Sequence, residues 1–234
     1  TFDYGQDLKG EAKIERFESN KVDAFAITDL SKVWTSYVTD YKRGIRLTQE
    51  RNMFIIQDEY KLKPNVNELY WFIHTMGDAE VTNNGKSAVL TIDNVELRVE
   101  LLTDCDGEFV VMDALPMPGS ASEKIEGQNQ NTQFKKLAFR FNTVADGTFA
   151  VALIPINKEI PTEYSIPQLQ ALDEWTLNDD SYYEERNPML LSQIYVDGQP
   201  LANFDPYTNS YEYVVPFGKR TVPKITTVEE TQIL

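Results

Sequence analysis

Apolar and polar residues alternate with a period of two along much of the first two thirds of the chain. In VELRVELL, residues 95–102, every second residue is apolar and the residues between them are charged. This alternation is typical of a strand with one buried face. Just upstream, residues 88–93 alternate in the same way, and Asn84-Gly85 supplies the pair of positive φ angles that a tight hairpin turn favours. The pattern predicts a three-stranded meander over residues 79–102.

Further β-rich runs are separated by turn signals, and almost none shows a sustained 3.6-residue apolar period. They cover residues 12–17, 22–30, 44–49, 52–62, 68–77, 107–115, 135–143 and 148–156. Such a series predicts an all-β fold, a large antiparallel β-sandwich. Residues 116–133 lack a hydrophobic period and are expected to form a long surface loop. The one helical suggestion is IPQLQALDEW, residues 166–175, with Pro167 near its start.

The composition changes after Ile156 and divides the chain into three parts. Residues 1–156 are predicted to form the sandwich. Residues 157–189 are rich in proline and charge, and we expect a connector that contains the short helix. Within it, Tyr182-Tyr183 is expected to pack against the sandwich. A second β pattern covers residues 190–234, and these 45 residues are too few for a complete sandwich core.

Charge and hydropathy exclude two classes of partner. Lys and Arg total 22 against 37 Asp and Glu, a formal charge of −15 that opposes binding to nucleic acid. No run approaches the roughly 18 apolar residues that a membrane helix needs, so no membrane insertion is expected. The chain starts at Thr1 without a leader pattern, which we interpret as a start inside a longer protein.

The chain contains one histidine, His74, and one cysteine, Cys105. They limit the available chemistry, because neither a multi-histidine metal site nor an internal disulfide can be built. His74 follows Trp71, Phe72 and Ile73 in a predicted strand, and this setting favours a partly buried structural histidine over a proton-transfer group or a metal ligand. Cys105 has no nearby histidine in the sequence to activate it, so a packed side chain is favoured over a nucleophile.

Asp104 and Asp106 flank Cys105 just before Gly107 and are weak candidates for a calcium site, because carboxylate oxygens are the ligands that calcium prefers. The later glutamate of an EF-hand loop is missing. A hairpin turn with solvated acids is therefore the favoured interpretation.

The order of motifs in YKRGIRLTQERNMFIIQDEYKLKPNVNELYWFIHT, residues 41–75, resembles the β-sandwich region of the heparinase II/III-like polysaccharide lyases. TFDYGQD at the start and VDAFAITDL, residues 22–30, are similar to two further strands of that region. The resemblance covers about residues 1–156. A second one lies in residues 190–225, where L-x-x-I-x-V-D-G, L-x-x-F-D-P-x-T-x-x-Y and a V-V-P strand resemble the first half of a bacterial cadherin-like module.

The first resemblance implies a lyase with an N-terminal α/α toroid and a C-terminal sandwich, periplasmic or secreted, that cleaves uronic-acid polysaccharides by β-elimination. In that chemistry a base removes the C5 proton, polar or cationic groups neutralise the carboxylate, and an acid protonates the leaving oxygen. Most catalytic groups of the family lie on the toroid, which this chain does not contain, and its zinc ligands belong to earlier sequence. The chain is therefore expected to be non-catalytic, with the toroid of its parent and a polysaccharide as partners and with a zinc or calcium ion, if any, in the parent.

The residues expected to contact sugar are aromatic and cationic side chains in the predicted strands, because aromatic rings stack on sugar CH groups and arginine forks match carboxylates. They are Tyr41, Arg43, Tyr60, Trp71 and Arg98, with His74 as a further candidate. Each also fits an ordinary strand position. The alternative function is a stand-alone carbohydrate-binding or adhesion module. The two functions predict different surfaces. An accessory domain of a lyase would expose a broad apolar face, whereas a binding module would expose a compact aromatic groove.

Overall fold

The computed structural model describes residues 6–7, 9–120, 123, 126–127, 129, 131–156, 165–181, 191–205, 211–216, 218 and 221–229. The chain divides into two units, Thr1–Asp179 and Asp180–Leu234. All strand pairs are antiparallel, and the described helical elements are two short 3₁₀ turns. The predicted all-β fold is confirmed.

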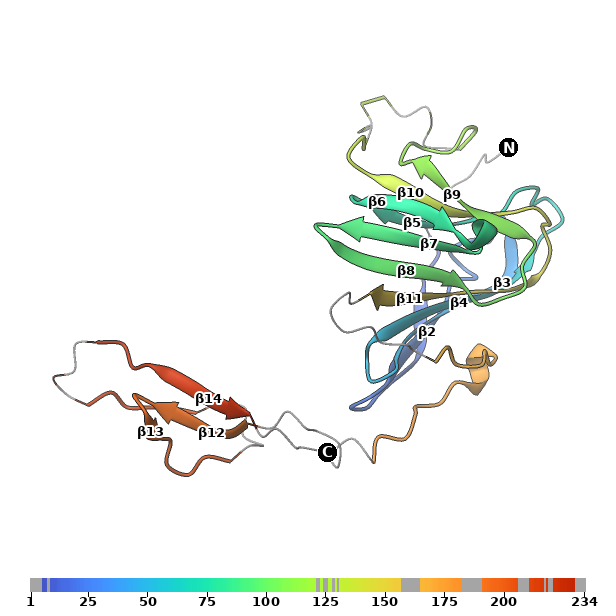
Figure 1. Ribbon diagram of the computed structural model, residues 1–234. Coiled ribbons are helices and arrows are strands. Elements are labelled where there is room, and N and C mark those ends of the chain that lie inside the picture. Colours follow the sequence, from blue (N-terminus) through green and yellow to red (C-terminus); the bar gives the residue numbers. More distant parts are fainter. Residues whose placement is uncertain are drawn as a thin grey trace. The chain divides into compact units, whose positions relative to one another are not determined.

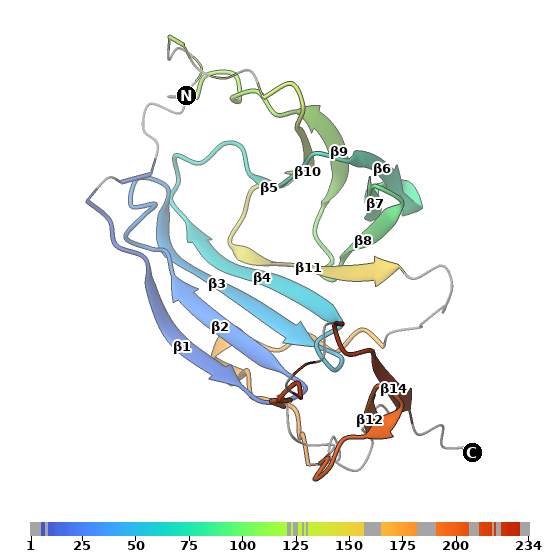
Figure 2. The same ribbon diagram turned by 90° about the vertical axis from the view of Figure 1, so that its left-hand side faces the viewer.

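The first unit contains an eight-stranded and a three-stranded sheet (Figures 1 and 2). The large sheet has the order β1-β2-β3-β4-β11-β8-β7-β6, and the small sheet the order β5-β10-β9. Their strands are β1 (Lys13–Ser19), β2 (Ala24–Asp29), β3 (Val38–Thr48), β4 (Met53–Leu62), β5 (Tyr70–Thr75), β6 (Asp78–Thr82), β7 (Ser87–Ile92), β8 (Val95–Leu101), β9 (Gly107–Asp113), β10 (Lys135–Phe141) and β11 (Gly147–Ile156).

The predicted meander over 79–102 is formed by β6, β7 and β8. The turn between β6 and β7 is the 3₁₀ element η1 (Asn83–Gly85), in which all three residues have positive φ. Asparagine and glycine adopt this left-handed conformation at the lowest cost. The Asn84-Gly85 signal therefore located a real hairpin.

The main core lies between the small sheet and one half of the large sheet. Its buried side chains come from β5, β9 and β10 on one side and from β7, β8 and β11 on the other, and they include Trp71, Phe109, Leu137, Phe139, Val99, Phe149 and Val151. Alternation of apolar side chains along each strand places one face of both sheets in this core. The predicted sandwich is thus formed, with the small sheet covering only part of the large one.

A strap over residues 165–179 covers the other face of β2 and β3 and forms a second core. Leu172 and Trp175 pack there against Phe25 and Ile27, and the rings of Trp175 and Phe25 meet edge to face at 5.8 Å. Leu172 can pack this closely because residue 44 is a glycine. A Cβ atom at this position would lie 2.3 Å from the Leu172 side chain. The predicted helix over 166–175 is wrong: only the 3₁₀ turn η2 (Leu172–Glu174) forms.

Side-chain hydrogen bonds fasten this strap to the sheet, which explains why it is not a helix: its backbone groups are satisfied from outside. Arg16 donates to the carbonyl of Trp175 at 2.8 Å, and the backbone N–H of Leu172 donates to Glu59 at 2.8 Å. Asp23, fully buried, accepts from Arg46 and from the backbone N–H of Asn178. Residues 165–179, expected in a connector, belong to the first unit; Tyr182-Tyr183 lies outside the described residues.

The second unit contains a separate three-stranded sheet with the order β13-β12-β14. Its strands are β12 (Leu191–Val196), β13 (Gln199–Pro200) and β14 (Ile225–Glu229). Asp197-Gly198 turns between the first two with positive φ at both residues. The V-V-P segment, expected as a strand, is irregular over 211–216, and Val214 and Val222 are almost fully exposed. The strands do not join the main sheets, as predicted.

Candidate functional site

One half of the core-facing side of the large sheet is left uncovered by the small sheet. The register places Val151, Ile56, Ile45, Ala26 and Phe17 side by side in one row across five strands. Along this row the exposed fraction rises from 0% at Val151 to 43% at Ile45 and 70% at Phe17. The same apolar surface that forms the core thus continues into solvent over β1 to β4.

The neighbouring rows repeat this pattern. Phe54, beside Leu47 and Leu153, is 44% exposed, and Ile14, beside Thr28, is 62% exposed. Figure 2 views this side of the first unit and shows β1 to β4 beside the small sheet. We call this surface the open face and define it by its apolar side chains, Ile14, Phe17, Ala26, Ile45, Leu47 and Phe54.

A polar cluster lies where the open face meets the covered core. Arg43 and Asp58 are register partners on β3 and β4, next to the buried Phe149 of β11. Arg43 binds the carboxylate through two parallel bonds, Nε to Oδ1 at 2.6 Å and an Nη2 bond to Oδ2 at 2.7 Å. The Tyr41 hydroxyl donates to Oδ1 at 3.4 Å. Bidentate charge-assisted pairs of this kind hold an arginine in one orientation.

Burial and the Asp58 charge set the protonation states of this cluster. Burial raises the pKa of Tyr41 well above its usual range, and the charge of Asp58 adds to this shift. Burial likewise raises the pKa of Tyr60, the register partner of Tyr41. For Arg43, burial alone would lower the pKa, but the hydrogen bond and charge of Asp58 outweigh it and the pKa is raised. Both phenols stay protonated, so neither is suited to act as a general base near neutral pH.

Arg43 keeps part of its donor capacity. Only Nε and Nη2 are used, and within the described residues Nη1 makes no hydrogen bond. The side chain of Arg43 is 35% exposed, whereas that of Asp58 is 6% exposed. The free edge of an oriented guanidinium can bind a carboxylate or another acceptor. The chemistry of the cluster is therefore recognition, not proton transfer.

The structure brings together three of the six predicted contact residues, Tyr41, Arg43 and Tyr60. Trp71 belongs to the main core, where it is 6% exposed and its ring lies 5.5 Å from that of Phe149, so it takes the ordinary strand position that was the alternative to a sugar contact. Arg98 lies on the opposite face of the large sheet, in register with Ile154, and pairs with Glu100 at 3.2 Å. Successive side chains of a strand point to opposite faces of the sheet, so Arg98 cannot reach the Arg43–Asp58 cluster.

His74 lies on the outer face of the small sheet, because Trp71 and Ile73 take the inner positions of β5. It is exposed, so the expectation of a partly buried histidine is wrong. Its pKa is lowered by desolvation and then by the charge of Lys136, its register partner. It belongs to no group of three or more metal-ligating side chains in the described part of the chain.

Asp104 and Asp106, the weak candidates for a calcium site, lie in the turn before β9. Asp106 accepts hydrogen bonds from Asn142 at 3.0 Å and from Thr143 at 2.8 Å, and these two bonds lower its pKa. Asp104 is exposed, and the described residues contain no group of three or more metal-ligating side chains. The turn reading is supported. Burial raises the pKa of the Cys105 thiol, which keeps it protonated and unsuited to nucleophilic attack.

Sequence reasoning missed Asp58, although a signal was present. In FIIQDEY the residues in the apolar phase of the strand are Phe54, Ile56, Asp58 and Tyr60, so Asp58 is a charged residue at a core-facing position. A buried charge needs a partner, and Arg43 could have been proposed from the hairpin register. The strap contacts carry no comparable local signal.

A scan against models of protein families and a search of curated proteins both give no match to this chain. The resemblance to the heparinase II/III-like lyases therefore stays a prediction from the motifs. Neither 3₁₀ turn in the described part of the chain has the length and apolar character needed to cross a bilayer.

Proposed function

We propose that the chain is a non-catalytic accessory β-sandwich whose open face packs against a second domain, an α/α toroid, in a periplasmic or secreted polysaccharide lyase. The observation that carries this proposal is the exposed apolar surface of β1 to β4. Contiguous apolar patches of this kind mark interaction surfaces. The lyase context and the location rest on the motif order in residues 1–156.

The open face has the properties of a domain interface. Its four most exposed large side chains, Ile14, Phe17, Ile45 and Phe54, belong to β1, β3 and β4 of one sheet, and the small Ala26 of β2 lies between them. Each is 43–70% exposed, so burying the remaining exposed part would contribute about half of the roughly 1.5–3 kcal/mol that full burial of such a side chain gives. The free edge of Arg43 at its border would add directional hydrogen bonds to this apolar contact.

Complex formation with the toroid of the same gene, supplied in trans, tests the docking part of the proposal. We expect co-elution in gel filtration, and we expect Ile45→Asp and Phe54→Asp to abolish it because each buries a charge in the interface. Val95→Asp is the matched control: Val95 is 70% exposed on β8, away from the open face. A complex that survives both open-face substitutions would refute the docking role.

Activity of the chain alone tests its non-catalytic character. β-Elimination leaves a conjugated double bond that absorbs in the ultraviolet, and it needs a base, an acid and a carboxylate neutraliser together. Around Arg43 the two phenols have raised pKa values, so no product is expected from heparan sulfate or alginate. A steady rise in absorbance that Tyr41→Phe or Tyr60→Phe removes would show an enzyme.

The free edge of Arg43 favours a second candidate function, direct binding of an acidic polysaccharide by a stand-alone module. Retention on an alginate matrix without any toroid, lost in Arg43→Met and kept in Arg140→Met, would support it. Arg140 is the matched control because it also pairs with a carboxylate, that of Glu108, on the surface.

A further inference from the structure

A buried lysine on the outer face of the small sheet has no counter-ion. Lys136 is 5% exposed, although it lies on the side of β10 opposite the main core. No carboxylate of the described residues lies within ion-pair distance of it. Its ammonium group donates one hydrogen bond, to the carbonyl oxygen of Leu115 at 2.5 Å, and lies 5.1 Å from the ring centre of Phe72. Two of the three ammonium donors thus make no hydrogen bond to described residues.

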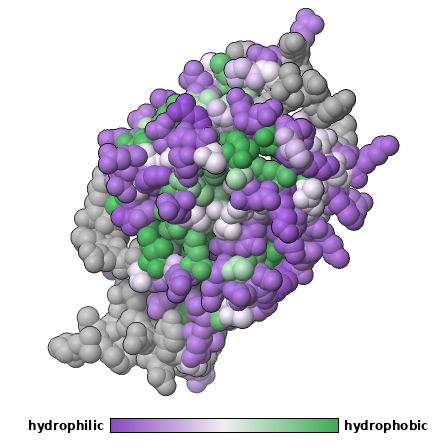
Figure 3. All heavy atoms as spheres, turned by 90° about the vertical axis from the view of Figure 1, so that its right-hand side faces the viewer, coloured by the Kyte–Doolittle hydropathy of each residue, from purple (hydrophilic) through white to green (hydrophobic). Residues whose placement is uncertain are grey.

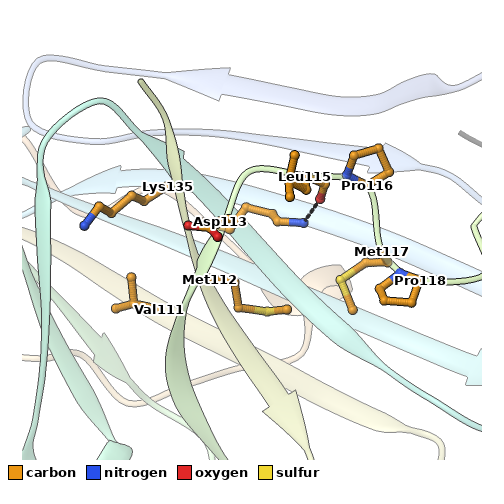
Figure 4. A pocket seen from close by; sticks show the side chains of 9 residues that line it. Val111, Met112, Asp113, Leu115, Pro116, Met117, Pro118 and Lys135 are labelled. Atoms are coloured by element: carbon orange, nitrogen blue, oxygen red, sulfur yellow. Dashed lines mark hydrogen bonds between the residues drawn. The ribbon is translucent and has the colours of Figure 1, made fainter. Parts of the chain in front are cut away.

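The segment that follows β9 covers this lysine and forms one wall of a hollow that is open to solvent. The hollow is lined by nine residues, which are Val111, Met112, Asp113, Leu115, Pro116, Met117, Pro118, Lys135 and Lys136 (Figure 4). Most of this lining is apolar. Methionine side chains adapt their shape to a ligand, and proline keeps the covering segment stiff.

An unpaired buried ammonium is costly, because desolvation is not offset by an opposite charge. The same desolvation lowers the pKa of Lys136. An anion in the hollow would restore the missing interaction, and an apolar body would displace water from the methionine and proline walls. Asp113 is exposed and makes no ion pair with Lys136 among the described residues, so it does not satisfy the ammonium.

We propose that this hollow binds a small carboxylate with an apolar body, with the carboxylate accepting hydrogen bonds from Nζ of Lys136 and the body packed against Met112, Met117 and Pro118. The site lies on the outer side of the small sheet, whereas the open face belongs to the large sheet. It is therefore independent of the docking proposal. Figure 3 shows that, on the side drawn there, apolar residues gather in separate patches among hydrophilic ones, so an apolar probe must be localised and not only detected.

Titration of the whole chain with octanoate tests the site. Amide chemical shifts in NMR spectra locate the bound probe, and 1-octanol is the uncharged control ligand. Octanoate is expected to saturate one site, to shift the amides of residues 111–115, 117 and 135–136, and to bind at least about tenfold more tightly than 1-octanol. Lys136→Met should weaken octanoate binding by at least about tenfold. Lys13→Met, a change of the exposed lysine at the start of β1, should leave binding unchanged.

A second variant guards against loss of folding. Met117→Trp keeps the lysine and fills the hollow, and it should also weaken octanoate binding while the melting temperature stays close to that of the wild type. Equal octanoate affinity in the wild type and in a folded Lys136→Met, or no saturable binding to the wild type, would overturn the proposal. Shifts confined to Ile45 and Phe54 would also overturn it, since the probe would then occupy the open face.

Discussion

Two charged side chains buried in sheets, Asp58 and Lys136, differ in how their charges are satisfied. Asp58 accepts two bonds from Arg43 and one from Tyr41. Lys136 has one carbonyl and one aromatic ring. Removing the partner of a buried, paired charge destabilises the fold. A buried, unpaired charge indicates either a ligand site or a desolvation free energy that other interactions of the fold offset.

Asp58→Ala should destabilise the first unit by about 1–3 kcal/mol, because Arg43 and Tyr41 would lose their acceptor in a half-buried position. Urea unfolding measures this change. Glu108→Ala is the control, since its pair with Arg140 is nearly half exposed on both sides and is worth about 0–1 kcal/mol. Equal losses in the two variants would mean that the Arg43 pair has no special role.

His74 should titrate below its usual pKa of about 6.5, since desolvation and the charge of Lys136 both disfavour its protonated form. The folded state then binds this proton less readily than the unfolded state, so the contribution of His74 to stability is unchanged above about pH 6.5 and falls as the pH drops through that value. One histidine gives one imidazole signal in NMR, which makes the titration unambiguous. Lys136→Met should raise the midpoint in part only, because desolvation is the larger cause.

At the scale of elements, the strap over 165–179 stabilises the large sheet without joining it. Leu172 and Trp175 fill the space above Gly44, and Asn178 is tied to Asp23, Thr48 and Asn20. Its sequence suggested a short helix over 166–175, but side chains of β1 and β4 satisfy backbone groups of this segment and only the turn η2 forms. The strap therefore closes the face opposite the open face.

Trp175→Ala should cost about 3–5 kcal/mol, the usual price of removing a large buried aromatic side chain. Chemical unfolding followed by tyrosine fluorescence measures it. Ile166→Ala lies in the same strap at an exposed position and should change stability by less than about 0.5 kcal/mol. A small effect of Trp175→Ala would show that the strap is not part of the cooperative unit.

At the scale of the whole molecule, the two units differ in how well they bury apolar side chains. The first unit contains both sheets, the main core and the strap core. In the described part of the second unit, Val196 is buried, while Val214, Val222 and Ile225 are strongly exposed. Small sheets with few buried side chains are marginally stable by themselves.

Residues 1–179 should therefore fold alone with a cooperative melting transition close to that of the whole chain. A chain cut at residue 156 lacks Leu172 and Trp175 and should melt at a clearly lower temperature, because Phe25 and Ile27 lose their cover. Differential scanning calorimetry of the three lengths measures this order. A melting temperature for residues 1–156 equal to that of residues 1–179 would place the boundary at Ile156 instead of Asp179.

The sequence by itself determined most strands of the first unit and the Asn84-Gly85 turn, because periodicity and left-handed turn residues act over a few positions of chain. The alternation of apolar and polar residues also determined which side chains of a hairpin share a face. The Arg43–Asp58 pair could therefore have been predicted from the β3–β4 hairpin. Only the tertiary structure decided that the small sheet covers half of the large one, that Trp71 is core and His74 exposed, and that residues 165–179 form a strap. These features depend on contacts between segments far apart in the sequence, such as Arg46 with Asn178, whose free energy no local pattern records.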